Sequence, residues 1–374
     1  MEYQVLVAGG GTAGMAASLE LARMGYQVLL IEKKEELGGQ ALHLACVATD
    51  QCQKCGACLP LQLKNEVINQ PGLTVRTGHE VREITVQGEQ QGDHEAGPGR
   101  GRRQYTVQVQ SAGSNSDKEE SEFSLTAYQV EAVIIATGFK VFPAELRGEF
   151  GYGRYAGVVS SLDLEQVWLK HSTLSAVYGQ LQRVAFIQCV GSRDRRAGNP
   201  YCSKVCCSYA LRMAQRMKWE FPEIEINLFY MNFQEQQRLL PPEMVLQATP
   251  PGIKRIRSIP ARVYQYPGQK VVLDWELPAS GKQQSNEYDL VVLSVGITAG
   301  DFNHRVSQQL GLNLDAGGFL ETISPEDRSG REWMPGVFSA GTCRGPADLP
   351  TTLKQGKQVA NQVNNYLKFN LRKV

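Results

Sequence analysis

The sequence predicts an α/β protein with two dinucleotide-binding-type domains, the first of which is interrupted by the second. Residues 3–31 hold a strand, a glycine-rich turn, a helix and a second strand, which together make one βαβ unit. A second strand–helix–strand order runs from Arg183 to Tyr230. Two short apolar strands that end in glycine, Val133–Gly138 and Gly336–Gly341, lie on either side of it. This order predicts two Rossmann-like sheets within the 374 residues.

The composition is that of an ordinary globular protein, with 42% apolar residues and a formal net charge of +1 from 39 basic and 38 acidic residues. Such a balance gives no indication of nucleic acid or an anionic membrane as a partner. No apolar run reaches the ~18 residues of a membrane-spanning helix, and the first strand begins too early for a cleaved signal peptide. Nine cysteines without a leader favour the reducing cytoplasm, where metal or redox chemistry outweighs structural disulfides.

The amino-terminal unit carries the pattern G-x-G-x-x-G at Gly9, Gly11 and Gly14, followed by an acidic residue, Glu32, at the end of the second strand. The first glycine permits a tight turn, the second lets the backbone approach a pyrophosphate, and the third lets helix and strand pack closely. A carboxylate at this place can accept both hydroxyls of an adenosine ribose, and it repels a 2′-phosphate. We therefore expect a dinucleotide other than NADP here.

Three further stretches resemble flavoproteins with two dinucleotide domains, such as thioredoxin and glutathione reductases. Leu37–Gln40 resembles their second glycine pair, Val133–Gly138 their strand-plus-ATG element, and Gly336–Gly341 the strand that contacts the flavin ribityl chain. The resemblance implies FAD and a discontinuous FAD domain. We expect FAD-binding parts at residues 1–145, with a cysteine insert, and 291–374, and an inserted Rossmann-like domain at 146–290. The usual Asp after the last glycine is replaced by Thr342, which we expect to donate to the ribityl chain.

A helix predicted from Pro350 has its amide-rich start near the flavin, where it would stabilise the anionic reduced form and raise the flavin potential. The expected FAD contacts come from these motifs. They are Gly9, Gly11, Thr12, Ala13, Gly14, Glu32, Lys33, Gly38, Gly39, Gln40, Ala136, Thr137, Gly138, Gly341, Thr342, Leu349, Pro350 and Thr351.

Four cysteines gather where the inserted domain would otherwise bind a nicotinamide cofactor. Cys189 follows an apolar strand, and Cys202, Cys206 and Cys207 precede a helix predicted from Tyr209. Adjacent cysteines can hardly share one packed core, and amide N–H groups at a helix start stabilise thiolates. No second G-x-G-x-x-G is present, so a pyrophosphate would lack its cradle. We expect a [4Fe-4S] cluster on these four thiolates; zinc and unliganded cysteines are the alternatives.

A second group, Cys46, Cys52, Cys55 and Cys58, has the spacing C-x5-C-x2-C-x2-C. The last three match the opening of a ferredoxin-type run, so a second [4Fe-4S] cluster is our preferred interpretation, with zinc as an alternative. A third interpretation starts from the glycine pair. Cys46 stands where disulfide reductases place the cysteine that faces the flavin, although Ala41 occupies the position of its partner.

Gln188-Cys-Val-Gly-Ser-Arg-Asp and Tyr201-Cys-Ser-Lys-Val-Cys-Cys together resemble the cluster motif of the A-type subunits of heterodisulfide reductases, and Gly345-Pro-Ala-Asp-Leu-Pro resembles their flavin-adjacent turn. Because the extra ferredoxin domains of large members are lacking, the chain resembles compact homologues. The Cys46–Cys58 stretch is more similar to the sulfur-oxidising heterodisulfide reductase-like group than to the flavoprotein of the quinone-interacting complex of sulfate reducers.

The resemblance implies an FAD, a [4Fe-4S] cluster and a cytoplasmic multi-subunit assembly. Its partners would be B- and C-like subunits and a lipoate-carrying protein, with a homodimer inside the larger complex. We therefore expect an electron-transfer flavoprotein subunit in sulfur-compound oxidation. An NAD(P)H- or thiol-linked disulfide reductase and a non-enzymatic scaffold are the alternatives. The sequence identifies no catalytic residue.

Overall fold

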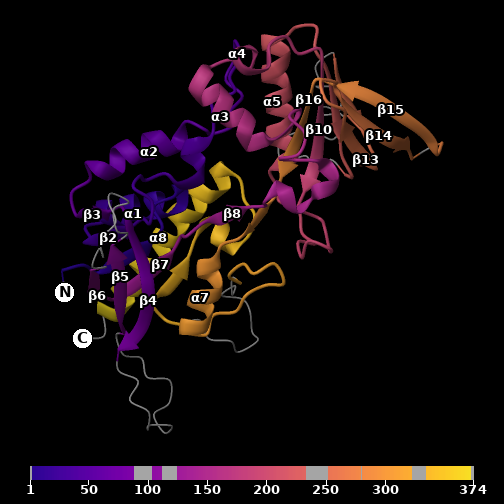
Figure 1. Ribbon diagram of the computed structural model, residues 1–374. Coiled ribbons are helices and arrows are strands. Elements are labelled where there is room, and N and C mark those ends of the chain that lie inside the picture. Colours follow the sequence, from indigo (N-terminus) through magenta and orange to yellow (C-terminus); the bar gives the residue numbers. More distant parts are fainter. Residues whose placement is uncertain are drawn as a thin grey trace. The chain divides into compact units, whose positions relative to one another are not determined.

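The computed structural model describes residues 2–87, 103–111, 124–232, 252–278, 280–321 and 334–371, which form two compact units (Figure 1). Unit 1 comprises residues 1–42, 58–139 and 299–374, and unit 2 comprises residues 43–57 and 140–298. Each unit centres on a five-stranded parallel sheet with a smaller antiparallel sheet. The predicted α/β class with two Rossmann-like domains, one of them discontinuous, is confirmed.

The parallel sheet of unit 1 has the strand order β18-β7-β1-β2-β3. Its strands are β1 (Val5–Ala8), β2 (Val28–Ile31), β3 (Leu73–Arg76), β7 (Ala132–Ile135) and β18 (Val337–Ser339). The antiparallel sheet consists of β4 (His79–Gln87), β5 (Gln104–Ser111) and β6 (Leu125–Val130), and the helices are α1 (Thr12–Arg23), α2 (Leu59–Ile68), α7 (Asp301–Leu310) and α8 (Leu349–Leu371). Short 3-10 turns lie at Gly39–His43 and Gly341–Arg344.

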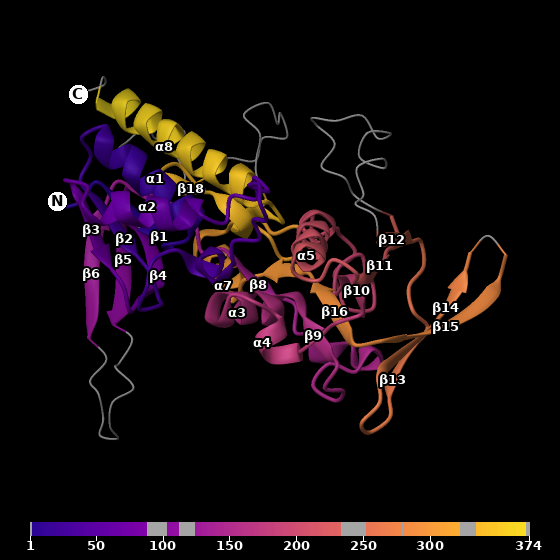
Figure 2. The same ribbon diagram turned by 90° about the horizontal axis from the view of Figure 1, so that it is seen from above.

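Both faces of this parallel sheet are covered, which explains why its strands are continuous apolar runs. Val5 and Val7 pack into a core with α1 and α8, whose close packing is visible in Figure 2. Leu6 and Ala8 point to the opposite face and pack against β4, β5 and α7. The alternation follows from the two-residue period of a strand.

The parallel sheet of unit 2 has the order β12-β11-β10-β16-β9. Its strands are β9 (Val158–Ser160), β10 (Arg183–Val190), β11 (Glu225–Phe229), β12 (Ile253–Ile256) and β16 (Leu290–Val295). The remaining elements are α3 (Ser161–His171), α4 (Ser175–Tyr178), α5 (Cys206–Glu220), β13 (Arg262–Gln265), β14 (Val271–Leu277) and β15 (Lys282–Tyr288), together with 3-10 turns at Ala144–Leu146 and Gly148–Phe150. The short strands β8 (Phe139–Val141) and β17 (Ile297–Ala299) pair with each other.

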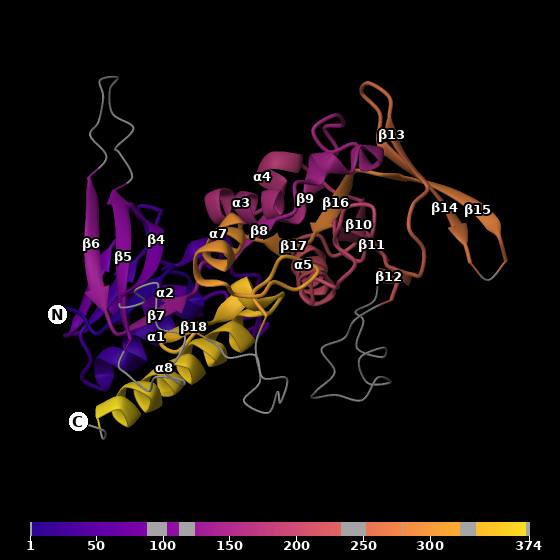
Figure 3. The ribbon, with the colours of Figure 1, turned by 90° about the horizontal axis from the view of Figure 1, so that it is seen from below.

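Helices α3 and α5 pack on one face of this sheet, where they contact Val184 and Phe186 of β10. Ala185 and Ile187 point to the other face, against the antiparallel sheet of β13, β14 and β15 (Figure 3). The cysteine motif begins with Cys189, at the carboxyl end of this central strand, β10.

Two observations differ from the sequence expectations. The segment 43–57, predicted as part of the FAD-binding domain, packs with unit 2. Helix α5 begins at Cys206, three residues before its predicted start at Tyr209, so that Cys206 and Cys207 lie in its first turn. The polar stretches 88–102 and 112–123, on either side of β5, lie outside the described residues. In the part of the chain that the structure covers, no helix combines the length and the hydrophobicity that crossing a membrane requires.

Candidate functional site

The glycine turn after β1 leaves an open place directly in front of helix α1. Gly9 has a φ of +110°, and a Cβ there would lie 2.3 Å from the Ala136 carbonyl oxygen. A Cβ at Gly14 would lie 1.8 Å from the carbonyl oxygen of Gly9, whereas a Cβ at Gly11 would meet nothing within 4 Å. No side chain caps the amino terminus of α1. Its first N–H groups are therefore available to a pyrophosphate at Gly11.

Glu32 is fixed beside this turn although it is only 6% exposed. One carboxylate oxygen accepts a hydrogen bond from the Gly10 N–H at 2.7 Å, and the other accepts from the Lys34 N–H at 2.9 Å. The Gly38 N–H donates to the Gly10 carbonyl at 2.7 Å, which joins the second glycine pair to the first turn. This geometry suits a carboxylate that receives ribose hydroxyls next to a pyrophosphate cradle.

The other predicted FAD contacts also belong to unit 1. Two of them lie close to the glycine turn, since a Cβ at Gly341 would lie 2.7 Å from the Ala13 Cβ and a Cβ at Gly39 would lie 3.2 Å from the Gly11 Cα. Gly356 of α8 packs so closely on α1 that a Cβ would lie 2.4 Å from the Ala13 carbonyl oxygen. The Thr137 hydroxyl is buried without a hydrogen-bond partner among the described residues. A buried orphan hydroxyl is costly, and a bound FAD would supply its partner. The residues present thus fit the FAD that the sequence predicts.

The carboxyl end of β10 and the start of α5 bring three cysteines of the predicted cluster motif together. Cys189, Cys206 and Cys207 form a buried group, with Met231 packed against it. Hydrogen bonds from Cys189 and Cys207 lower the pKa of the Cys206 thiol. The pKa of the Cys189 thiol is raised, mainly by its hydrogen bond to Cys206 and by burial, with a smaller contribution from Cys202. The thiols of Cys189, Cys206 and Cys207 therefore lie together in one buried group.

Several features of this region fit an iron–sulfur cluster. Gln188 and Ser192 are 2% and 1% exposed, and their polar side-chain atoms have no partner among the described residues. No side chain caps α5, so the N–H groups of its first turn, which holds Cys206 and Cys207, remain available to stabilise negative charge there. In the described ranges, no group of three or more His, Cys, Asp or Glu side chains has the arrangement that a single metal ion requires. A cubane spreads its ligands over four irons and does not require that arrangement.

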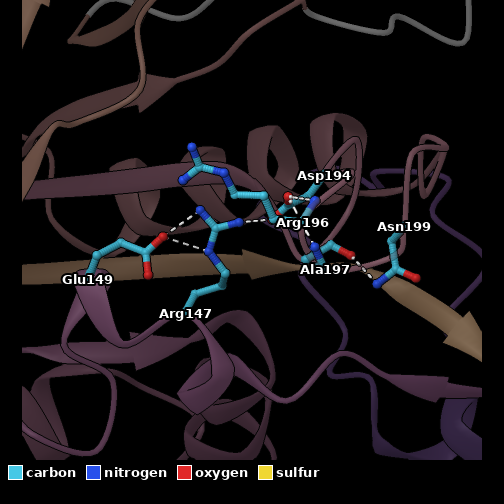
Figure 4. A network of polar contacts seen from close by, with 7 residues as sticks. Arg147, Glu149, Asp194, Arg196, Ala197 and Asn199 are labelled. Carbon is cyan, nitrogen blue, oxygen red and sulfur yellow. Dashed lines mark hydrogen bonds and ion pairs between the residues drawn. The ribbon is translucent and has the colours of Figure 1, made fainter.

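The loop between Cys189 and Cys202 is held by a polar network that sequence reasoning missed (Figure 4). The Asp194 carboxylate accepts from the Arg196 and Ala197 N–H groups at 2.9 and 3.3 Å, and it pairs with Arg147. The backbones of Asp194 and Asn199 exchange two hydrogen bonds, and the Asn199 amide donates to the Gly191 carbonyl at 3.0 Å. An Asp two and three residues before the N–H groups that it accepts from is a common turn pattern, which the sequence of the loop shows. The contact with Arg147 joins residues far apart in the chain, so no short sequence pattern indicates it.

The amino-terminal cysteines divide between the units. Cys46, Cys52 and Cys55 belong to unit 2, whereas Cys58 precedes α2 in unit 1. The Sγ of Cys52 accepts from the Lys54 N–H at 3.4 Å, and Lys54 has a φ of +49°. Cys202 has the same Cys-x-Lys turn, since its Sγ accepts from the Lys204 N–H at 3.3 Å and Lys204 has a φ of +60°. The two cysteine motifs thus share one local geometry.

Segment 43–57 is attached to unit 2 by buried contacts. Ala45 and Val47 enter the core between α3 and α5. The Ala45 N–H donates to the Glu165 carboxylate at 2.5 Å, and Arg216 of α5 donates to the Ala48 carbonyl at 2.8 Å. These contacts hold the backbone that carries Cys46, while the Cys46 side chain itself is exposed.

Burial of Glu165 predicts a pH dependence of stability. Desolvation raises the pKa of this carboxyl from 4.5 to about 7. The folded state therefore keeps a proton that the unfolded state releases, so the free energy of unfolding falls as pH rises from about 4.5 to about 7. The full loss above pH 7 is about 3 kcal/mol. We expect Glu165→Gln, which keeps an acceptor for Ala45, to match the parent at pH 5 and to exceed it by this amount at pH 8.

Calorimetric unfolding between pH 5 and pH 8 measures this difference. Glu223→Gln is the control because it removes an exposed carboxylate that has no hydrogen bond or ion pair among the described residues. Parallel pH profiles for the parent and Glu165→Gln would contradict the prediction.

Residues 4–96 match the family model described as FAD dependent oxidoreductase. The chain is 29% identical over 419 residues to an A-type iron-sulfur subunit of the CoB–CoM heterodisulfide reductase of Methanopyrus kandleri, covering 96% of this chain and 63% of that protein. It is 28% identical to the A-type subunit of the H2:CoB-CoM heterodisulfide,ferredoxin reductase of Methanothermobacter marburgensis, again covering 96% and 63%. The chain thus spans less than two thirds of the length of these relatives.

Among solved structures, the thioredoxin reductase of Lactococcus lactis has a TM-score of 0.58 at 18% identity, covering 97% of this chain and 98% of that one. The thioredoxin reductase of T. acidophilum has a TM-score of 0.57 at 18% identity, with 98% of each chain covered. These likenesses concern the fold. The chain is thus similar to FAD-dependent oxidoreductases over residues 4–96 and, over most of its length, to A-type subunits of heterodisulfide reductases.

Proposed function

We propose that this chain is the FAD- and iron–sulfur-containing electron-transfer subunit of a cytoplasmic heterodisulfide reductase-like complex that oxidises sulfur compounds. FAD exchanges electrons in pairs, and iron–sulfur clusters exchange them singly. In this proposal Cys189, Cys202, Cys206 and Cys207 hold one [4Fe-4S] cluster. Cys46, Cys52, Cys55 and Cys58 hold a second. B- and C-like subunits and a lipoate-carrying protein are its partners, and it forms a homodimer within the complex.

One observation carries the electron-transfer assignment. After β1, the position of a Cβ on Gly11 is open, as a pyrophosphate site requires. After β10, the sequence has no second G-x-G-x-x-G, and the ring of Phe142 packs against Gly191, where a Cβ would lie 1.9 Å from it. Unit 2 therefore lacks the glycine cradle of a pyrophosphate after its central strand, and cysteines gather there instead. This favours electron transfer by a cluster over a nicotinamide-linked disulfide reductase.

The names of the relatives support the choice of complex, since these proteins are A-type subunits of heterodisulfide reductases described as iron-sulfur subunits. The sulfur-oxidising assignment rests on the sequence of the Cys46–Cys58 stretch. The flavoprotein of a quinone-interacting sulfate-reduction complex is the alternative. The shared Cys-x-Lys turn at Lys54 and Lys204 supports the second cluster, because both turns direct a backbone N–H to a cysteine sulfur.

Anaerobic purification followed by iron and flavin analysis tests the proposal. We expect one FAD and about eight irons per chain, which is two cubanes. Cys52→Ser should reduce the iron to about four and leave the flavin unchanged. A parent protein with about four irons, none of which is lost in Cys52→Ser, would exclude the second cluster. It would direct attention to Cys46 as a thiol that faces the flavin.

A further inference from the structure

We propose that the loop between Cys189 and Cys202 is a basic docking face, on which a one-electron redox protein with an acidic surface exchanges electrons with the cluster. The proposal rests on the cluster proposed for Cys189, Cys202, Cys206 and Cys207. It adds the place and the charge of the partner contact, which neither the family match nor the relatives specify.

The loop is a rigid platform. The Asp194 carboxylate closes a turn onto the Arg196 and Ala197 N–H groups, and Asp194 and Asn199 pair through their backbones (Figure 4). Arg147 clamps the turn from outside, and it is itself held by Glu149, whose carboxylate accepts from the Arg147 Nε at 2.7 Å. A partner that meets this loop therefore loses little free energy in ordering it.

The charge on this platform is predominantly positive. The loop, its clamp and the adjacent Lys204 contain five basic side chains and two acidic ones. They are Arg147, Arg193, Arg195, Arg196 and Lys204 against Glu149 and Asp194. Both acids pair with the same residue, Arg147. Arg195 and Arg196 are exposed, and their guanidinium groups have no ion-pair partner among the described residues. Two unpaired arginines on a fixed turn favour an acidic partner.

Two arginines bind the backbone of the segment that packs against the cysteine group. Arg193 donates to the Asn232 carbonyl at 3.5 Å, and Arg257 donates to the Met231 carbonyl at 3.3 Å. Met231 packs directly against the buried cysteines. Cys202, at the end of the loop, is the only cysteine of this motif that is not buried. A cluster held by these four cysteines would therefore be most accessible to a protein docked on the loop from the side of Cys202.

A cluster held by these cysteines would exchange one electron at a time with the partner's redox centre, so that one centre is oxidised and the other reduced without transfer of a proton or a chemical group. The arginines take no part in the electron exchange. They raise the local concentration of an acidic partner and its rate of encounter, an effect that falls with ionic strength.

Binding of a fluorescein-labelled decaglutamate peptide, measured by fluorescence anisotropy, tests the docking face without using the cluster. We expect the double variant Arg195→Glu and Arg196→Glu to weaken binding about tenfold or more, and salt to weaken binding to the parent. Arg154→Glu is the control, because it reverses the charge of an exposed arginine of unit 2 that does not belong to the loop. Arg154 stacks on the ring of Tyr155. Equal peptide binding by the double variant and the parent would overturn the proposal.

Oxidation of the dithionite-reduced protein by small mediators gives a second readout. We expect the double variant to be oxidised about tenfold more slowly than the parent by ferricyanide, an anion, and faster by hexaammineruthenium(III), a cation. Unchanged rates with both mediators would count against the loop as the point of exchange. Iron content and visible spectra are measured first on each variant. A parent without iron that still binds the peptide at Arg195 and Arg196 would refute the cluster and leave the docking face standing.

Discussion

Replacing Gly11 by valine is expected to give a folded protein that has lost its FAD. Gly11 has a φ of −75° and a ψ of −175°, an extended conformation that valine adopts readily. A Cβ at this position meets no atom of the protein within 4 Å, so the side chain finds room in the free protein. The same room is where the pyrophosphate would lie against α1. We expect affinity for FAD to fall at least about a hundredfold, or about 3 kcal/mol.

Flavin released by heating, together with the circular dichroism spectrum, measures this outcome. Gly148→Val is the matched control, because Gly148 also has nothing within 4 Å of its Cβ position and lies in unit 2. Gly14→Ala provides the contrast, since its Cβ would collide with the Gly9 carbonyl and disturb the fold itself. A folded Gly11→Val protein that carries a full complement of FAD would refute the assignment of the glycine turn.

The sequence predicted the two parallel sheets because their signals are local. Each central strand is buried on both faces and therefore reads as a continuous apolar run, as in Val5–Ala8 and Arg183–Val190. The turn at Gly9 needs a positive φ that glycine supplies, and Glu32 lies at a fixed spacing from it. These features depend on neighbours in the chain, so spacing alone was sufficient to predict them.

The sequence could not predict the attachment of segment 43–57 to unit 2. That attachment comes from the Ala45–Glu165 and Arg216–Ala48 hydrogen bonds, which join residues 120 and 168 positions apart. The segment mixes apolar and polar residues without the regular spacing of a strand or a helix, so its sequence does not show which of them enter a core. The Arg147–Asp194 clamp was missed for the same reason, since Arg147 lies in an irregular region between two 3-10 turns.

The backbone of the cysteine motifs was equally hidden from sequence analysis. Among the residues that the structure describes, five non-glycine residues have a positive φ, and four of them lie in or beside the two cysteine motifs. They are Lys54, Cys189, Arg193 and Lys204. Such conformations cost free energy and persist where the surrounding structure enforces them, often at functional sites. Residue type gives no warning of them, because lysine, arginine and cysteine ordinarily avoid this region.

Replacing Cys206 by alanine is expected to remove the proposed cluster and to leave FAD in place. Cys206 is 1% exposed, lies in the first turn of α5, and accepts hydrogen bonds from two neighbouring cysteines. Alanine is smaller and a good helix former, so the helix should persist while one of four thiolate ligands is lost. We expect the protein to lose about four irons and the associated visible absorption. The ratio of FAD to protein should not change, because the predicted flavin contacts belong to unit 1.

The matched control is Cys343→Ala, which removes an equally buried cysteine that belongs to neither motif. Burial raises the pKa of the Cys343 thiol to about 12, and its Sγ donates to the carbonyls of Ile135 and Ala340, so it is a neutral structural thiol in unit 1. Iron content should therefore stay at the parent level in this variant. If the parent, purified without oxygen, contains zinc and no iron, or if Cys206→Ala retains all its iron, Cys206 is not a cluster ligand. In that case a group other than a cluster must satisfy the side chains of Gln188 and Ser192. Their buried polar atoms have no hydrogen-bond partner among the described residues.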